Sequence, residues 1–328
     1  MKAAGTDNEG RADGKRPVFG HLPVLLEEVL VALQVEKGGR FLDGTFGGGG
    51  HARAILEGNA ENRLVAIDRD PRAARRAEGL RVDFGDRFQF LAGEFSELLG
   101  EMEEPFDGIL LDLGVSSYQL DEGERGFSFR EEAALDMRMD DSRGISAAEF
   151  LETAPESQLV QAIRDFGEEQ SWRRVVAAVL QARGTGQLGT TTGFSSLIES
   201  VIGTRPVRGR RPIHPATRSF QGVRIAVNDE LGVLERALPL AFERLKEGGR
   251  LGVISFHSLE DRMVKRFFRT MAGRPEHRGD SRCQDERLVR GSMPFSKPVV
   301  ANDAELESNP RARSARFRVL IREDGGGR

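Results

Sequence analysis

Cysteine, tryptophan and tyrosine are scarce in this sequence, since each occurs once among 328 residues. The single cysteine, Cys283, rules out an internal disulfide and any zinc site made of several thiolates, and it suits a reducing cytoplasm. No apolar run approaches the length that spans a membrane, so we expect no membrane contact. Residues 1–20 lack the apolar segment of a signal peptide, and we expect them to form a disordered tail.

Metal-ligand spacing is also missing among the five histidines, and we therefore expect no bound metal. Excess positive charge is missing as well: the formal net charge of −4 argues against a protein that coats nucleic acid along its whole surface. Any contact with nucleic acid must then be a local patch. The length predicts one large domain plus a smaller one, and the composition is typical of a soluble globular protein.

A glycine-rich stretch from Gly39 to His51 is the most informative part of the chain. The apolar pair Phe41-Leu42 leads to Asp43, a run of glycines follows, and the next residues have a helical pattern. A strand, a tight turn and a helix in this order place a ligand at the carboxyl end of the strand. Glycine is required where a ligand lies against the backbone, so a bulky side chain at Gly49 is expected to collide with that ligand and weaken its binding while leaving the fold intact.

Short apolar segments alternate with helical patterns over most of the chain. Strands are expected at 41–42, 63–68, 88–91, 107–112, 250–256 and 316–321, and helices at 22–33, 51–57, 231–245 and after Asp70-Pro71. This alternation predicts a parallel sheet covered on both faces.

Between about residues 124 and 215 no buried strand is expected, and helical spacing recurs at 150–161 and 172–181. The chain is therefore divided into a first part of an α/β core at 21–123, a helical insertion at 124–215 and a second part of the core at 216–328. Within that second part, 272–314 is expected to be a long loop.

Three of the predicted strands end in an acid, namely Asp43, Asp68 and Asp112. The carboxyl ends of parallel strands meet at one edge of a sheet, so these acids should surround one crevice. A dinucleotide such as NAD favours a different order of glycines and a phosphate at the helix N-terminus. S-adenosylmethionine carries a sulfonium cation, which carboxylates stabilise, and it suits this crevice better.

Two further motifs follow predicted strands. The first motif is Asp112–Ser117. Its Ser116 could hold a substrate amine or accept the proton of that amine, or it could simply cap a helix. In the second, His257 lies between two serines, which invites a hydrolase interpretation, but the glycines of a nucleophile elbow are absent.

Concentrated positive charge occurs in the segment 205–218, which has no acid and contains Arg205, Arg208, Arg210, Arg211 and Arg218. A second group consists of Arg311, Arg313, Arg316 and Arg318. Such segments are either solvated faces or contacts for a phosphate backbone, and composition alone leaves both interpretations open.

A series of motifs, in order along the chain, resembles the bacterial ribosomal RNA small-subunit methyltransferase H family (MraW type). The motifs are Asp43–Phe46, Gly49–His51, Ala66–Pro71, Ile109–Ser117, Arg125–Phe129, Leu135–Met139, His214–Arg218, Ser255–Arg262 and Asn309–Arg313. The resemblance extends from about His21 to about Ile321. It implies a Rossmann-like class I S-adenosylmethionine-dependent methyltransferase sheet with an inserted helical domain.

The resemblance also implies the reaction: methyl transfer from S-adenosylmethionine to the N4 amine of a decoding-centre cytidine in 16S ribosomal RNA, in the cytoplasm. The substrate would be naked RNA or the small ribosomal subunit, and a homodimer is left open. The family's cofactor positions correspond to Gly49, Gly50, His51, Asp68, Phe95, Asp112 and Gln119. Two residues depart from the family pattern: Tyr118 stands where the family usually has proline, and Gly48 stands where a larger residue is common. Because of Tyr118, the sequence does not determine the conformation of the turn before Gln119.

Methylation of a cytosine amine requires hydrogen-bond acceptors, because the lone pair of that amine is delocalised into the ring. Acceptors favour a pyramidal nitrogen and take its proton, and no metal is required. The candidates are Asp112, Ser116 and His257, in that order. The base must be unstacked, so loop or single-stranded RNA is expected. The alternative is a non-catalytic nucleotide-binding regulatory or ribosome-assembly module, and a dehydrogenase is a more distant third.

Overall fold

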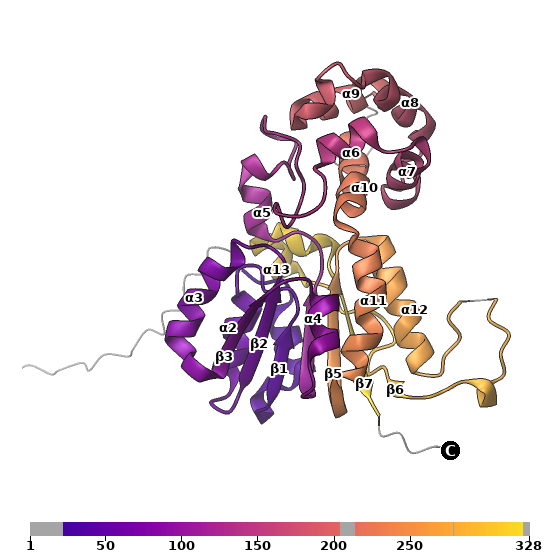
Figure 1. Cartoon of the computed structure of the whole chain (residues 1–328). Coiled ribbons are helices and arrows are strands. Elements are labelled where there is room, and N and C mark those ends of the chain that lie inside the picture. The colour runs from indigo at the N-terminus through magenta and orange to yellow at the C-terminus, as the bar shows by residue number, and fades with distance from the viewer. Residues whose placement is uncertain (1–21, 204–213, 278, 324–328) are drawn as a thin grey trace, which may run out of the picture.

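A seven-stranded sheet forms the centre of the computed structural model, which describes residues 22–203, 214–277 and 279–323 (Figure 1). Its strands are β1 (Arg40–Asp43), β2 (Arg63–Asp68), β3 (Phe88–Ala92), β4 (Phe106–Asp112), β5 (Leu245–Ser255), β6 (Gly291–Ser292) and β7 (Arg316–Arg322). The strand order is β3-β2-β1-β4-β5-β7-β6. Strands β1 to β5 are parallel, whereas β7 is antiparallel to β5 and β6. This confirms the predicted Rossmann-like α/β fold.

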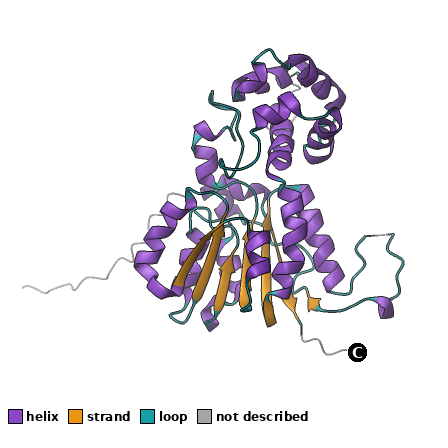
Figure 2. Cartoon of the chain, viewed as in Figure 1, coloured by secondary structure: helices purple, strands orange, loops and turns teal. Residues whose placement is uncertain are grey.

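Helices cover both faces of the sheet (Figure 2). They are α1 (Leu26–Leu33), α2 (Gly50–Gly58), α3 (Ala73–Phe84), α4 (Phe95–Glu101), α5 (Ser117–Asp121), α10 (Ala216–Asn228), α11 (Glu230–Glu243), α12 (Ser258–Met271) and α13 (Asp303–Ser308). Neighbouring residues of β1 show the two faces: Phe41 packs in a core with α1 to α3, and Leu42 packs in a core with α4, α11 and α12. Side chains of a strand alternate between faces, which explains this division.

A helical lobe is inserted in the chain between β4 and β5, which are neighbours in the sheet, and it stands at one end of the sheet (Figure 1). Its helices are α6 (Ala147–Thr153), α7 (Glu156–Val160), α8 (Trp172–Ala182) and α9 (Thr191–Ile202), with a π-helical turn at Gln161–Phe166. The lobe has an apolar core of its own, which also contains Ala216, Phe220 and Val223. These three residues belong to α10, so the core of the lobe extends past residue 215, where the insertion was expected to end.

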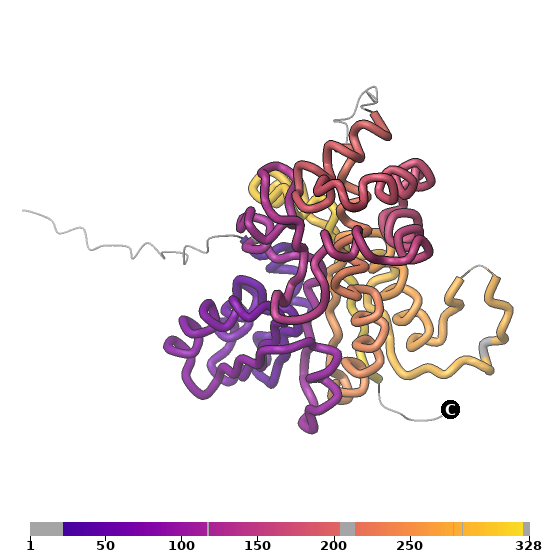
Figure 3. Tube along the Cα trace, turned by 45° about the horizontal axis from the view of Figure 1, so that its top comes forward, coloured from indigo at the N-terminus to yellow at the C-terminus, as the bar shows by residue number. Residues whose placement is uncertain are grey.

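Several elements differ from the sequence-based expectation. Helix α1 begins four residues later than expected, because Leu25 adopts a left-handed conformation with φ of 53°. The segment 272–314 is not simply a loop, since it contains β6 and α13. Its first half projects from the body of the molecule in both views (Figures 1 and 3). Helix α9 was not expected, although Thr190 caps its N-terminus through a side-chain hydrogen bond. In the described part of the chain, no helix has the length and apolar character needed to cross a membrane.

Candidate functional site

A cavity of about 700 Å³ opens where the parallel strands end, and the predicted cofactor residues line it. The structure brings together Gly49, Gly50, His51, Asp68, Phe95, Asp112 and Gln119 around it, and Ser116 lines it as well. The glycine loop after β1 and Asp68, the last residue of β2, form one side. Phe256 and Glu260 after β5, with Arg224 and Glu230 from α10 and α11, form the other. Asp112 ends β4, the strand between β1 and β5.

The glycine loop is tied to the second strand. The backbone N–H of Gly47 donates to Asp68 Oδ2 at 2.7 Å, so the acid at the end of β2 fixes the loop after β1. Gly49 has a φ of +78°, and a Cβ there would lie 2.7 Å from Cζ of Phe46. A larger residue at Gly49 would therefore disturb the loop itself, which corrects the expectation that it would only collide with a ligand.

The two departures from the family pattern contact each other. A Cβ on Gly48 would lie 2.6 Å from Cε2 of Tyr118, so the tyrosine ring fills the space that a larger residue at 48 would take. The guanidinium of Arg76 lies 4.6 Å from the centre of the same ring, and its Nε donates to the Gly47 carbonyl at 2.8 Å. Tyr118 and Gly48 are therefore complementary, and the ring covers the glycine loop.

The contact between Gly48 and Tyr118 predicts compensating mutations. Gly48→Ala is expected to displace the ring and weaken S-adenosylmethionine binding about fivefold or more, the scale of coupling between residues in contact. Tyr118→Ala removes the clash, so the double variant should bind more tightly than Gly48→Ala alone. Isothermal titration calorimetry on the four proteins measures this. Strictly additive effects would contradict the coupling.

His51 is held neutral beside Asp112. Its Nε2 lies 3.0 Å from the Val24 carbonyl, which only accepts hydrogen bonds, so the ring proton is on Nε2. Nδ1 is then an acceptor and lies 3.5 Å from Asp112 Oδ2. Burial lowers the pKa of His51 to about 4, because the charged form loses its hydration. At neutral pH the ring is therefore uncharged and adds no positive charge beside Asp112.

The three strand-end acids are crowded into a region of low polarity. Burial, with a smaller effect of Asp68, raises the pKa of Asp43 to about 7. Burial also raises the pKa of Asp68, and it raises that of Asp112 well above its usual range, with Asp43 and Glu260 adding like-charge repulsion. Asp112 Oδ1 is buried and has no hydrogen-bond partner among the described residues. Asp68 and Asp112 line the cavity, whereas Asp43 is buried beside them and does not line it, which corrects the expectation that all three acids surround one crevice. Such a group of acids is short of positive charge and suits a cationic ligand.

Ser116 caps a helix, which is one of the two interpretations that its sequence position allowed. Its hydroxyl accepts from the N–H of Gln119 at 3.2 Å, and Gln119 Oε1 accepts from the N–H of Ser116 at 2.9 Å. This capping box begins α5. Gln119 Nε2 also donates to Asp70 Oδ2 at 3.3 Å, so the turn before Gln119 is fixed at both ends.

Glu260 reaches the cavity, whereas His257 does not line it. The carboxylate Oε2 of Glu260 accepts from the N–H groups of Phe256 at 2.8 Å and His257 at 3.2 Å. Burial opposes ionisation of Glu260, but bonds from His257 and Phe256 and the charge of Arg224 lower its pKa. The His257 ring caps α12 and faces a second hollow of about 400 Å³, lined also by Arg313 and Arg316.

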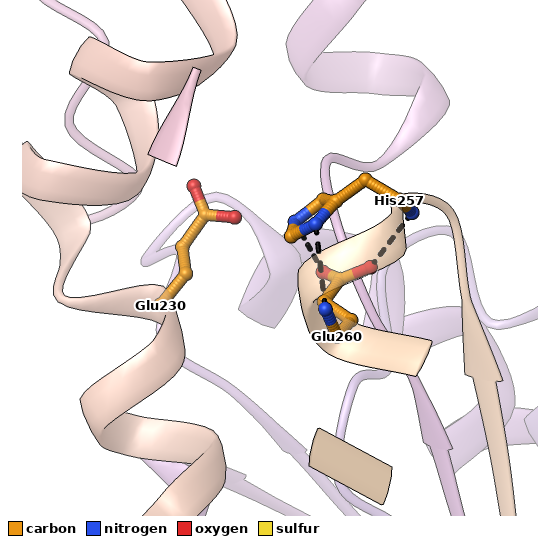
Figure 4. Close-up of side chains that lie close together, drawn as sticks. All are labelled: Glu230, His257 and Glu260. Atoms are coloured by element: carbon orange, nitrogen blue, oxygen red, sulfur yellow. Dashed lines mark hydrogen bonds and ion pairs between the residues drawn. The ribbon is translucent and has the colours of Figure 1, made fainter. Parts of the chain in front are cut away.

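Three groups near this end of the cavity have the spacing of a metal site. Glu230, His257 and Glu260 each offer a ligand atom within 4.8 Å of the others (Figure 4). Arg224, however, donates to both carboxylate oxygens of Glu230 at 2.8 and 2.9 Å. A guanidinium already balances this carboxylate, and it would repel a cation bound beside it.

The structure describes only some of the predicted arginines. Arg205, Arg208, Arg210 and Arg211 lie outside the described residues. Arg218 is exposed on α10. In the C-terminal group, Arg311 pairs with Asp121, and Arg316 and Arg318 pair with Asp261. Arg313 is exposed and has no acidic partner in the described part of the chain.

Sequence reasoning missed Glu260, Arg224 and Glu230. A signal existed for Glu260, because a glutamate three residues after a helix cap is typical of a capping box. Arg224 and Glu230 belong to two helices whose corner at Asp229 has a φ of +48°, and nothing in their spacing indicated a site.

Comparisons with known proteins match nearly the whole chain. The model of the MraW methylase family matches residues 18–323. The ribosomal RNA small subunit methyltransferase H of Gluconobacter oxydans is 48% identical over 309 residues, which cover 92% of this chain and 93% of that protein. The protein with this name from Methylobacterium nodulans is 46% identical over 311 residues, covering 93% and 91%. The one from Cereibacter sphaeroides is 45% identical over 306 residues, covering 93% and 90%.

Proposed function

The chain belongs to the MraW methylase family, and we propose that it methylates the N4 amine of a decoding-centre cytidine in small-subunit (16S) ribosomal RNA. Relatives at 45–48% identity carry the name ribosomal RNA small subunit methyltransferase H, which supports this substrate class. The structural observation that carries the proposal is the acid-lined cavity at the ends of β1, β2 and β4, beside a glycine loop.

The methyl donor is S-adenosylmethionine, and the residues of the cavity fit it. A loop with Gly47 and Gly49 at positive φ exposes its backbone to a ligand, and the two carboxyl groups of Asp68 and Asp112, which line the cavity with raised pKa values, favour a cation. We propose that Gly49, Gly50, His51, Asp68, Phe95, Asp112 and Gln119 hold it. When bound, S-adenosylmethionine supplies a methyl group on a positively charged sulfur.

Asp112 is the proposed acceptor for the proton of the target amine. It lies between the two sides of the cavity, its Oδ1 has no partner among the described residues, and its raised pKa makes it a stronger base than an exposed aspartate. Ser116 and His257 act in this proposal through the helices that they cap, because their side chains bond to the first turns of α5 and α12. They position Gln119 and Glu260 at the cavity wall.

The helical lobe and the arginines at its end are proposed to bind the RNA within the small subunit, in the cytoplasm. Arg218 is exposed on α10, the helix that also carries Arg224 into the cavity. Phosphate contacts there would position the target without reading its bases.

Incubation with labelled S-adenosylmethionine and small subunits that lack the modification tests the function. Nucleoside analysis should then detect labelled N4-methylcytidine at one position. Cofactor binding without methylation of the RNA would contradict the enzymatic proposal and favour the non-catalytic assembly module. Label on another nucleoside would contradict the proposed target atom.

Removal of charge from the segment 205–218 is expected to weaken RNA binding. Replacing Arg208, Arg210 and Arg211 by alanine should reduce affinity most at low salt. The log–log salt slope should fall by roughly one unit for each phosphate that the protein no longer neutralises. Affinity for S-adenosylmethionine should not change.

The matched control for this change replaces three exposed arginines of β2 and α3, namely Arg63, Arg75 and Arg81. It removes the same charge from another part of the surface. Equal effects of the two triple variants across a salt titration would show that only net charge matters.

A further inference from the structure

We infer that Arg224 recognises the ring acceptors of the target base and so selects cytosine at the β5 end of the cavity. This inference rests on the proposed function and concerns a residue that the sequence did not indicate. Arg224 and Glu230 line the cavity together with Phe256 and Glu260. Glu230 and Glu260 offer oxygens within 4.8 Å of each other, and Glu260 follows β5, which β4 separates from β1 and its glycine loop. The glycine-loop side has the features of a cofactor site, which leaves this side for the base.

The polar side chains at this end of the cavity form a spatial series from Asp112 through Glu260 to the guanidinium of Arg224. Asp112, Glu260, Glu230 and Arg224 line one cavity. Glu260 and Glu230 offer oxygens within 4.8 Å of each other, and Arg224 donates to Glu230, so Glu260 lies near the guanidinium. Glu260 also contributes to the raised pKa of Asp112, which places it near that carboxyl group. Glu260 is ionised, since its pKa is lowered, and its Oε2 is held by two backbone N–H groups. The carboxylate of Glu260, a hydrogen-bond acceptor, therefore lies next to Asp112, the proposed proton acceptor. The N–H donors of Arg224 lie beyond Glu260.

Arg224 is held by Glu230 along one edge of its guanidinium, and the Nη1 group remains available for a further hydrogen bond. Its Nε and Nη2 donate to the two oxygens of Glu230 at 2.8 and 2.9 Å. Its Nη1 has no hydrogen-bond partner among the described residues, and it is not among their buried unpaired atoms. The fork of Arg224 is thus pre-organised, which reduces the entropy lost when a further hydrogen bond forms.

This arrangement is complementary to the Watson–Crick edge of cytosine. That edge presents the N4 amine as a donor, followed by N3 and O2 as acceptors. Carboxylates would accept from the amine while Arg224 donates to a ring acceptor. Uracil presents an acceptor in place of the amine and a donor in place of N3. Its acceptor would face the carboxylates, which are also acceptors, and its donor would face the N–H donors of Arg224. Unpaired polar groups in such a site give strong discrimination.

A cycle that combines one enzyme variant with one substrate analogue tests the contact. Small subunits are prepared with cytidine or 3-deazacytidine at the position that the wild-type enzyme methylates; the analogue replaces ring N3 by C–H. Single-turnover methylation is measured with the wild-type enzyme and with Arg224→Lys, which keeps the charge but loses the planar fork. The intrinsic reactivity of the analogue affects both enzymes equally and cancels in the cycle.

The wild-type enzyme should lose about tenfold more rate than Arg224→Lys when N3 is removed, the scale of one charged hydrogen bond. Arg236→Lys is the matched control, because Arg236 also pairs with acids, Asp229 and Glu94, but does not line the cavity. It should behave as the wild type. Titration with S-adenosylmethionine checks that each variant is folded, and Glu230→Gln, which loosens the fork, should reduce the coupling even if Arg224→Lys fails that check.

An equal loss of rate in all enzymes would overturn the role of Arg224 while leaving the proposed function in place. Absence of N4-methylcytidine from the wild-type reaction would overturn the proposed function, and this inference with it.

Discussion

Asp112→Asn is expected to slow single-turnover methylation by about 100-fold or more, the usual effect of losing a positioned proton-transfer group. Asparagine has nearly the same shape, so its amide can keep the contact with His51, which is 3.5 Å from Oδ2 in the wild type. It cannot take a proton. The wild-type rate should also rise with pH, because burial raises the pKa of Asp112 and only the ionised carboxylate is a base. The variant should lose that rise.

The control for this prediction is Asp107→Asn, which changes an acid at the opposite end of the same strand. Asp107 pairs with Lys246 at 2.7 Å and does not line the cavity. Its methylation rate should stay near that of the wild type at saturating cofactor. If weaker binding of S-adenosylmethionine accounted for the whole loss in Asp112→Asn, Asp112 would be a cofactor contact only.

Asp43→Asn is expected to stabilise the cofactor-free protein at neutral and alkaline pH. Burial, assisted by Asp68, raises the pKa of Asp43 from its usual 3.8 to about 7 in the folded state. The folded state therefore binds the proton more tightly than the unfolded chain, and stability is lost as the pH rises through this range. Asparagine avoids this loss and can still accept the hydrogen bond from the N–H of Thr45. The gain should approach a few kcal/mol, about 4 at most.

Chemical denaturation at several pH values measures this gain. The difference in the free energy of unfolding should be absent below about pH 4, grow as the pH rises towards 7, and level off above it. Asp86→Asn changes an exposed acid and should show no such growth. A constant difference at every pH would mean that Asp43 is not the group that titrates.

Much of the sheet could be predicted from the sequence, because its physical causes are local. An apolar segment of four to seven residues that ends in an acid indicates a strand whatever its neighbours are, and the expected range 63–68 coincides with β2. The order of acids and glycines also indicated one crevice for Asp43, Asp68 and Asp112, and Asp68 and Asp112 do line the cavity, whereas Asp43 is buried beside it. Those acids follow parallel strands, whose carboxyl ends must meet at one edge.

The position of His257 could not be predicted in the same way. Its motif follows β5 as expected, yet the direction of its ring depends on the capping box with Glu260. Ser116 presents the same case, because its hydroxyl serves the first turn of α5. Residue type and spacing place a side chain on the rim of a sheet, but hydrogen bonds with nearby backbone decide where it points.

The sequence by itself determined every strand of the described sheet except β6, and also the glycine loop, the acids at the strand ends and the family of this protein. Only the tertiary structure decided that Tyr118 fills the space above Gly48 and that Arg224, fixed by Glu230, lines the same cavity as the loop. The physical reason is distance along the chain. Gly48 and Tyr118 belong to the turns after β1 and β4, and Arg224 lies beyond the helical lobe. Local patterns record which face a residue buries, whereas contacts between remote segments follow from how the sheet and the lobe pack together.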